Sequence, residues 1–279
     1  MRVNRTLELI RSRQLALGTW IELHDIYATR LLAAQGCFQW MLIDAEHSPV
    51  DGRTVAILCA MMTDISQGKI TPLVRVTAGT IDKIKQALDS GAQGIIAPMI
   101  NTAAEAADVV KFAKFPPEGQ RGIGGLFPHL SYGVRRPDYM VDANRETFVG
   151  IQIETKEGAS NIEEILDVKG IDLVFIGPND LHQSLGLKAQ FWSDERLFQE
   201  NIKKIVKACK ARNIPYGTLC PDAAQAKSRQ SEGFTFIGLG SDTSFLLSGA
   251  GKQYGDFYNI PEPPETWKGV VNLKPIKYL

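Results

Sequence analysis

Short apolar and β-branched segments recur along this chain, and each is followed by a longer segment of helical periodicity. Eight such segments occur, at residues 17–23, 40–43, 71–76, 94–97, 148–154, 171–176, 216–219 and 234–239. Continuous apolar runs are typical of strands buried on both faces, and their alternation with helices indicates a parallel sheet with crossover helices. Because the strand–helix unit occurs eight times, the sequence predicts an α/β fold: a closed (β/α)8 TIM barrel rather than an open sheet.

The length of 279 residues suits either one large barrel or two ordinary domains, and the strand–helix rhythm favours one barrel. We assign residues 1–258 to this catalytic barrel. Residues 259–279 include four prolines and show no helical period, so we expect an extended C-terminal tail on a surface or a neighbouring subunit. Residues 116–137 hold too many glycines and prolines for a helix, and we expect a lid or a disordered loop there.

Charge and cysteine content limit the partners and the compartment. Lysine plus arginine (31) balances aspartate plus glutamate (31), which predicts a small-molecule partner rather than nucleic acid or a membrane surface. The four cysteines form no Cys-x-x-Cys pair, and no apolar run is long enough for a signal peptide or a membrane span. We therefore expect a cytoplasmic protein.

Polar side chains stand where the predicted strands end. The active site of such a barrel lies at the carboxyl ends of its strands, so these residues are the first candidates for function. They are Glu22, His24, Asp44, Glu46, His47, Arg75, Gln152, Glu154, Asn179 and Asp180.

Glu154 and Asp180 are the candidate metal ligands. Two carboxylates from neighbouring strands, completed by water, suit a hard octahedral ion such as Mg²⁺ or Mn²⁺. Zinc is disfavoured because the chain has only four histidines and no histidine or cysteine cluster. One strand-end carboxylate alone is as often a helix cap or an ion-pair partner, so the prediction depends on the combination.

His47 and Arg75 are the candidate catalytic side chains. The unperturbed pKa of histidine, near ~6.5, suits proton transfer at neutral pH, and Asp44 stands three residues earlier, where it could orient the imidazole. Arg75 lies inside an apolar strand, where a guanidinium must meet an anion. That anion is either a nearby carboxylate or a substrate carboxylate or enolate.

Several other chemistries lack their motifs. The chain has no Gly-x-Ser-x-Gly elbow, no Walker A loop and no complete Gly-x-Gly-x-x-Gly, which removes the main support for a hydrolase, a kinase or a dehydrogenase. A Schiff-base aldolase needs a lysine at a strand end. Lys69 precedes its strand and the other lysines fall on helical or surface segments, so this mechanism is disfavoured.

Motifs in a characteristic order, over roughly residues 6–255, give the chain a resemblance to a known family. The motifs are Gly18-Thr19-Trp20, Asp44-Ala45-Glu46-His47, Val74-Arg75-Val76, Leu88-Asp89-Ser90-Gly91-Ala92, Ala97-Pro98-Met99, Arg121-Gly122, Gln152-Ile153-Glu154-Thr155 and Phe175-Ile176-Gly177-Pro178-Asn179-Asp180-Leu181. With these motifs, the chain resembles the hydroxy-oxo-acid aldolases of the HpcH/HpaI aldolase/citrate lyase family, in the phosphoenolpyruvate/pyruvate superfamily.

The resemblance implies a metal-dependent, class II aldolase, which is a carbon–carbon lyase. Such an enzyme cleaves 4-hydroxy-2-oxo acids to pyruvate, as its enolate, and an aldehyde, or runs the reverse addition. By position, Glu154 and Asp180 resemble the ligands of a divalent metal ion (Mg²⁺, Mn²⁺ or Co²⁺). His47 resembles the general base or acid, and Arg75 resembles the residue that stabilises the enolate.

The resemblance also implies substrate contacts and an assembly. Gln152, Asn179 and the backbone of Asp180 resemble substrate contacts, and Asp44 resembles the carboxylate beside the histidine. Asp89 ends a helical segment outside its own barrel and resembles a carboxylate that an adjacent subunit supplies to the histidine. The implied functional unit is a homo-oligomer, the hexamer usual in this family.

The sequence departs from the family pattern at residues 126–132, which replace a more polar loop, and at His182, where a serine is common. We expect His182 at the surface. Two alternative functions stay open: an oxaloacetate decarboxylase or macrophomate-synthase-like enzyme that adds the same enolate to another acceptor, and a non-catalytic metabolite-binding barrel.

Overall fold

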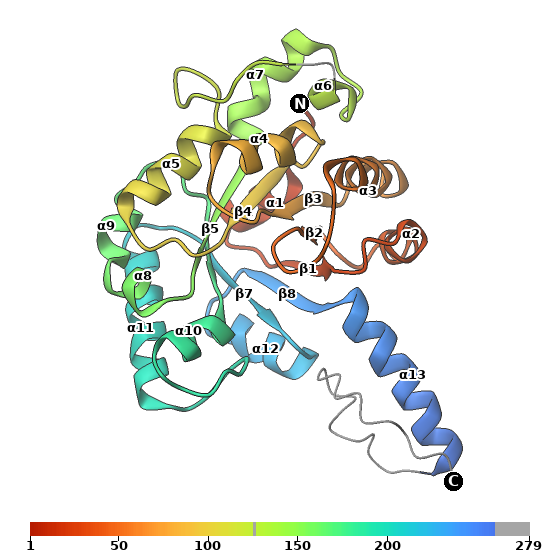
Figure 1. Cartoon of the computed structure of the whole chain (residues 1–279), viewed down its shortest axis with the longest axis vertical. Coiled ribbons are helices and arrows are strands. Elements are labelled where there is room, and N and C mark those ends of the chain that lie inside the picture. Colours follow the sequence, from red (N-terminus) through yellow and green to blue (C-terminus); the bar gives the residue numbers. More distant parts are fainter. Residues whose placement is uncertain (125–126, 260–279) are drawn as a thin grey trace.

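Eight parallel strands close into one barrel in chain order (Figure 1). The computed structural model describes residues 1–124 and 127–259. Each predicted apolar run overlaps one strand, which confirms the (β/α)8 barrel. The strands are β1 (Ala16–Ile21), β2 (Trp40–Asp44), β3 (Thr71–Arg75), β4 (Gly94–Ala97), β5 (Phe148–Ile153), β6 (Leu173–Ile176), β7 (Tyr216–Cys220) and β8 (Phe236–Ser241).

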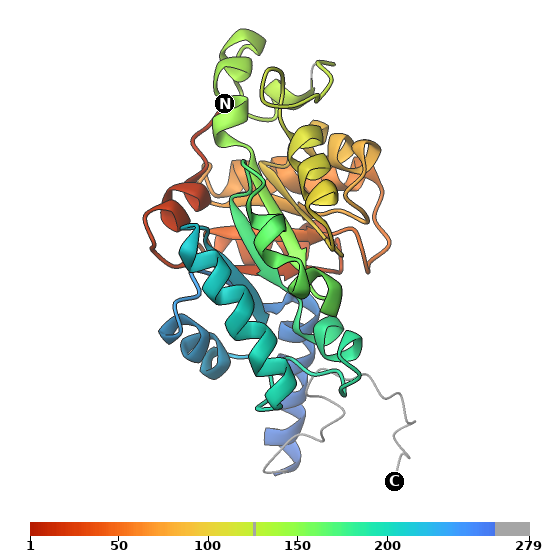
Figure 2. The ribbon, with the colours of Figure 1, turned by 90° about the vertical axis from the view of Figure 1, so that its left-hand side faces the viewer.

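Helices surround the barrel and connect consecutive strands (Figures 1 and 2). They are α1 (Arg5–Arg11), α2 (Ile26–Ala34), α3 (Gly52–Ile65), α4 (Ile81–Asp89), α5 (Ala103–Ala113), α6 (Phe127–Leu130), α7 (Arg136–Glu146), α8 (Lys156–Ser160), α9 (Ile162–Leu166), α10 (Pro178–Ser184), α11 (Arg196–Ala211), α12 (Ala223–Ser231) and α13 (Asp242–Tyr258). In the described ranges, no helix has the length and apolar character needed to cross a membrane.

The interior of the barrel is filled by large side chains. Trp40 stacks on Phe236 with ring centroids 4.1 Å apart, and Phe148 and Phe175 pack on the same phenylalanine. Gly18 makes room for Trp40, because a Cβ at this position would lie 2.0 Å from the indole. The interior is therefore a packed core, as in other barrels of this type, and polar chemistry is confined to the strand ends.

Several helices begin at residues that suit helix N-termini. Asp25 and Asp222 accept hydrogen bonds from the third helical backbone N–H of α2 and α12, and Thr80 is the N-cap of α4. Thr102 is the N-cap of α5, since it forms a reciprocal capping box with Glu105, which satisfies two backbone N–H groups.

The segment 116–137 contains more helix than its glycines and prolines predicted. It includes α6 and the start of α7, where Pro137 occupies the first turn, a position that needs no backbone donor. The Tyr132 hydroxyl donates to the carbonyl oxygens of Gly91 and Ala92, just before β4. The described part of this segment lies near the chain's amino end (Figure 1), rather than over the carboxyl ends as expected for a lid.

Helix α13 extends away from the barrel (Figures 1 and 2). Large apolar side chains on it are exposed, among them Leu246, Leu247, Phe257 and Tyr258. The helix ends at Asn259, which adopts a left-handed conformation. Apart from Asn259, the predicted proline-rich tail lies outside the described residues.

Candidate active site

Asp44 and Arg75 form a buried ion pair at the carboxyl ends of β2 and β3, where they are partners in the strand register. Arg75 Nε donates to Asp44 Oδ1 at 2.9 Å, and Nη2 donates to Oδ2 at 2.8 Å. The anion that the apolar strand required is therefore a carboxylate of the protein. Arg75 Nη1 makes no hydrogen bond within the described residues, so it can serve a substrate. The guanidinium also lies 4.1 Å from the centre of the Trp20 ring.

Glu46 is a member of the site to which sequence reasoning gave no role. Its Oε2 lies 3.2 Å from Arg75 Nε but accepts no hydrogen bond within the described residues. Burial raises the pKa of Glu46 to about 7; Arg75 opposes this shift, and the charges of Asp44 and Asp180 add to it. Its spacing of two residues from Asp44 was the available signal, because alternate residues of an extended segment share a face.

His47 stands apart from the carboxylate predicted to orient its ring. Its side chain is 64 % exposed, and its Nε2 lies 3.7 Å from Glu46 Oε2. Asp44 Oδ1 instead accepts from the backbone N–H groups of Glu46 and His47, at 3.1 and 3.4 Å. Asp44 thus fixes the loop that carries the imidazole, and Glu46 is the carboxylate nearest to the ring.

Glu154 is buried beyond the end of β5. Its Oε1 accepts from the backbone N–H of Met99 at 2.8 Å, and its Oε2 accepts from the Gln152 amide. Burial raises the pKa of Glu154 to about 7, and the nearby charges of Asp180 and Glu46 add to the rise. Gln152 therefore holds a predicted metal ligand, while its own Oε1 is buried without a hydrogen-bond partner in the described chain.

Asp180 and Asn179 lie in the first turn of α10, beyond the end of β6. Asp180 is exposed, yet its charge raises the pKa of both Glu46 and Glu154. Three carboxylates thus share one electrostatic environment.

These carboxylates fit a hard divalent cation. They offer oxygen ligands, and the buried Glu46 Oε2 has no hydrogen-bond donor in the described chain. Burial, and to a smaller extent the neighbouring carboxylates, raise the pKa of Glu46 and Glu154, and a cation would favour their ionised forms. Among residues 1–124 and 127–259, no three histidine, cysteine, aspartate or glutamate side chains converge closely enough to hold an ion by themselves. Water or substrate would complete the coordination.

Asp89 is not brought together with the other predicted residues. It ends α4 and pairs with Arg121, with Nη2 and Oδ1 2.8 Å apart. The buried Arg121 also donates to the Tyr139 hydroxyl and lies over the Phe115 ring. Because α4 runs back from the carboxyl end of β3 toward the start of β4, Asp89 is remote from the strand ends of its own barrel.

The expected surface position of His182 is wrong. The ring is fully buried, with Nδ1 2.6 Å from the Pro178 carbonyl and Nε2 2.8 Å from Ser193 Oγ. It also stacks on Phe198 with centroids 3.8 Å apart. His182 therefore fastens α10, the helix that carries Asp180, to the following loop and to α11.

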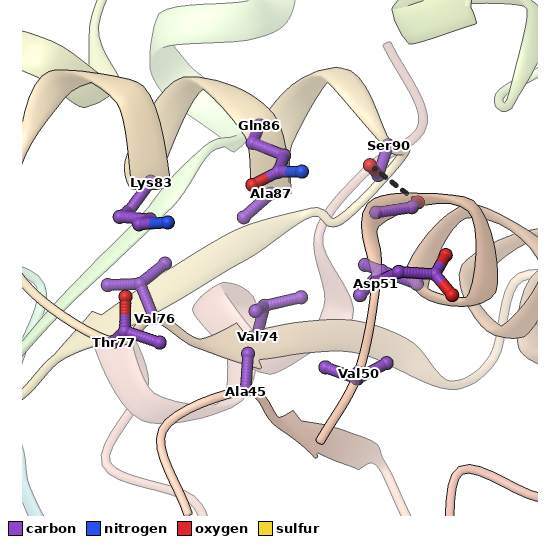
Figure 3. Close-up of a pocket in the computed structure, with 12 residues that line it drawn as sticks. Ala45, Val50, Asp51, Val74, Val76, Thr77, Lys83, Gln86, Ala87 and Ser90 are labelled. Carbon is purple, nitrogen blue, oxygen red and sulfur yellow. Dashed lines mark hydrogen bonds between the residues drawn. The ribbon is translucent and has the colours of Figure 1, made fainter. Parts of the chain in front are cut away.

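A pocket is lined by Ala45 and Val50, the residues on either side of the segment that carries Glu46 and His47 (Figure 3). It is bounded by the start of α3, by one side of α4 and by Val74 of β3. Val74 belongs to the apolar layer between strands and helices, whereas Asp44 and Arg75 occupy the inward positions. The pocket is therefore separate from the ring of polar residues.

A closed parallel barrel with carboxylates, an arginine and a histidine at its carboxyl ends defines a (β/α)8-barrel enzyme. The profile of one family, HpcH/HpaI aldolase/citrate lyase, matches residues 17–248. The chain belongs to this family, and it is a lyase of the aldolase type.

Two relatives of established name are each 36 % identical to this chain. The 4-hydroxy-2-oxo-heptane-1,7-dioate aldolase of Salmonella arizonae aligns over 247 residues, 88 % of this chain and 92 % of the relative. The hydroxypyruvate/pyruvate aldolase of Deinococcus radiodurans aligns over 236 residues, 84 % and 82 %. A crystal structure of a family member from Burkholderia cenocepacia J2315 superposes with a TM-score of 0.85 at 30 % identity, covering 92 % of this chain and all of that one.

Proposed function

We propose that this lyase is a metal-dependent, class II aldolase. It cleaves 4-hydroxy-2-oxo acids to pyruvate and an aldehyde, or joins the two. The observation that carries the proposal is the placement of the Glu154 and Asp180 carboxylates at the same end of the barrel as the buried Arg75–Asp44 pair. The names of the two relatives, both aldolases, support it.

Glu154 and Asp180 would hold the cation, which is Mg²⁺, Mn²⁺ or Co²⁺. When bound, the cation acts as a Lewis acid toward the 2-oxo group of the substrate. Gln152 and the Met99 N–H fix the Glu154 carboxylate from two sides. Gln152, Asn179 and the backbone of Asp180 contact the 2-oxo acid end of the substrate.

In the cleavage direction the bond between C3 and C4 breaks, and its electron pair remains on C3 as the pyruvate enolate, which then takes up a proton at C3 to give pyruvate. The proton of the 4-hydroxyl group passes to His47, and C4 becomes the aldehyde carbonyl carbon. Arg75 Nη1 donates to the enolate oxygen, where negative charge develops. Asp44 contributes by holding the other two guanidinium nitrogens in place.

An assay panel tests this function against its alternatives. Purified enzyme receives pyruvate with aldehydes, or oxaloacetate alone, with and without chelator. We expect addition to aldehydes that chelator abolishes and Mg²⁺ restores. Full activity in chelator, or trapping of a pyruvate adduct by borohydride, contradicts a class II mechanism. Rapid carbon dioxide release from oxaloacetate without aldehyde addition favours the decarboxylase, and no metal binding favours a non-catalytic barrel.

The functional unit in this proposal is a homohexamer in which Asp89 approaches His47 of an adjacent subunit. Asp89 lies outside its own barrel and remains about one third exposed beside Arg121, so a neighbouring chain can reach it. The exposed apolar residues of α13 supply a surface for such packing.

The proposed compartment is the cytoplasm. Three of the four cysteines are buried free thiols, and burial raises the pKa of Cys59, Cys209 and Cys220 to about 12. Such protonated thiols form structural core rather than reactive sites.

A further inference from the structure

Glu22 is a carboxylate at the end of the barrel that the proposed reaction does not use. It follows β1, in which Trp20 belongs to the interior core and Ile21 to the outer layer. Because side chains alternate along an extended segment, Glu22 is the next inward residue beyond Trp20. In the ring of eight strands, β1 lies four places from β5, so Glu22 stands across the barrel end from Glu154.

The position of Glu22 is fixed from several directions. The buried Asp242 carboxylate accepts from the backbone N–H groups of Glu22 and Leu23, at 2.9 and 3.1 Å. Thr243 Oγ1 donates to Glu22 Oε2, and the His24 ring contacts the Asp44 carbonyl at 3.0 Å. Glu22 Oε1 makes no hydrogen bond within residues 1–124 and 127–259, so one carboxylate oxygen is held in place without a partner.

A second polar atom on this side also lacks a partner. Trp20 is 2 % exposed, and its Nε1 donates to nothing in the described chain. This nitrogen faces Gly238 of β8, where a Cβ would lie 3.0 Å from it. Buried N–H groups are nearly always paired, so an unpaired donor beneath Glu22 is unusual.

The two strands on this side contribute no positive charge of their own. The segments 16–25 and 236–243, which form β1, β8 and the turns after them, include no lysine or arginine. Arg75 of β3 reaches the Trp20 ring, but two of its nitrogens bind Asp44 and the third is assigned to the enolate oxygen. A second carboxylate on a substrate that reached this side would meet Glu22 with no compensating cation from β1 or β8.

We infer that Glu22 selects the aldehyde: the enzyme takes an uncharged, hydroxylated aldehyde and rejects one that ends in a carboxylate. This inference rests on the proposed aldolase function. A substrate held by its 2-oxo acid end near Glu154 directs its far end across the barrel toward β1. A hydroxyl group there donates to Glu22 Oε1, whereas a carboxylate is repelled. The Salmonella relative, by its name, acts on a dioate, which has a carboxylate at both ends.

The test compares two acceptors in the direction of addition. Wild-type enzyme with Mg²⁺ and pyruvate receives either glyceraldehyde or succinic semialdehyde, and the ratio of the two kcat/KM values is measured. We expect the wild-type ratio to favour glyceraldehyde. Glu22→Gln removes the charge at constant shape, and we expect it to shift the ratio toward succinic semialdehyde by about tenfold or more, because like charges in contact are strongly unfavourable.

Asp25→Asn is the matched control. Asp25 is an exposed carboxylate three residues away that caps α2, and asparagine retains the cap. This variant should keep the wild-type ratio. The acceptor-independent exchange of pyruvate C3 protons in D₂O, measured for each protein, normalises the addition rates.

The outcomes separate the two proposals. If the wild-type enzyme catalyses exchange but prefers succinic semialdehyde, the role of Glu22 is overturned and the aldolase function stands. The same conclusion follows if exchange occurs and Glu22→Gln leaves the ratio unchanged. An equal shift in Asp25→Asn also overturns it, because the effect would then come from general charge. Absence of exchange in the wild-type enzyme overturns the aldolase function and, with it, this inference.

Discussion

Arg75 combines a structural and a proposed catalytic task, and variants can separate them. Arg75→Ala leaves the Asp44 carboxylate buried and unpaired, which should lower the free energy of unfolding by about 3–5 kcal/mol. Arg75→Lys keeps the charge without the two-point contact, and its kcat should fall by about 100- to 1000-fold with a smaller change in KM. Urea unfolding and steady-state kinetics measure the two effects.

Arg135 is the control for the stability effect. Its guanidinium contacts Asp138 with the same two-point geometry, at 2.8 and 3.0 Å, but its side chain is 82 % exposed. Arg135→Ala should therefore change the free energy of unfolding by only about 0–1 kcal/mol. Equal losses in the two variants would contradict the importance of burial, and an effect of Arg75→Lys confined to KM would make Arg75 a simple carboxylate anchor.

The raised pKa of Glu154 predicts how the free energy of unfolding depends on pH when no cation is bound. The pKa of Glu154 rises from 4.5 to about 7, so the folded protein binds this proton more tightly than the unfolded chain. The resulting stabilisation is present below pH 4.5 and is lost as pH rises through about 7. Chelated protein should therefore become less stable between pH 5 and pH 8, as judged by urea unfolding across that interval.

Two comparisons check this explanation. Glu154→Gln lacks the titrating group and should give a flatter pH profile. Added Mg²⁺ favours the ionised carboxylate and should reduce the decline in wild-type protein. The same profile for chelated wild type and Glu154→Gln would mean that Glu154 does not titrate in this range.

At the residue scale, the sequence indicated which residues form the site better than it indicated which atoms they contact. The need of Arg75 for an anion followed from a cation in an apolar strand, and an anion is present. The contact of the Glu154 carboxylate with the Met99 N–H was not predictable. It depends on a left-handed backbone at Met99 that brings residues 55 apart in sequence together.

Gly177, at the junction of β6 and α10, leaves the space that the Glu154 carboxylate occupies. It follows β6 and is the N-cap of α10, and a Cβ there would lie 2.3 Å from Glu154 Oε2. Gly177→Ala should therefore displace the carboxylate and weaken metal binding by roughly 10- to 100-fold, with the fold retained. Titration of chelated protein with Mn²⁺, followed by calorimetry, measures this loss.

Gly249 provides the matched substitution. It lies inside α13, where an added Cβ would meet nothing within 4 Å. Gly249→Ala should keep metal affinity and stabilise the helix by about 0.5–1 kcal/mol. Similar metal affinity for the Gly177→Ala protein and the wild type would show that the junction tolerates a side chain.

At the scale of elements, the strands could be predicted from the sequence, and the structure between α5 and β5 could not. Strands buried on both faces are long apolar runs, which a sequence shows directly. The helix α7 has no comparable signal, because tertiary contacts stabilise it: Tyr139 is buried against Tyr132 and Phe115. Only Arg136 and Pro137 of this helix fall within residues 116–137, whose composition predicted a loop, and packing supports the helix that follows.

At the scale of the molecule, the order of the strands in the barrel followed from the sequence. The proposed hexamer is instead argued from exposed apolar side chains on one helix, α13. Leu246 and Phe257 of α13 are 63 % and 76 % exposed in a single chain. Burying such side chains contributes about 1.5–3 kcal/mol each, so a partner surface is expected. The sequence could not locate this surface, because an amphipathic helix looks alike whether it packs within a chain or between chains.

The assembly prediction is that replacing both side chains by glutamate separates the subunits. Leu246→Glu with Phe257→Glu puts two charges where apolar contact is proposed, and the variant should sediment as a monomer while the wild type sediments as a hexamer. Its turnover should fall with dissociation, because Asp89 no longer reaches His47 of a neighbour. Lys252→Ala, at an exposed position of the same helix, should preserve both assembly and turnover. A double variant that stays assembled, or that works fully as a monomer, would show that α13 does not hold together a shared active site.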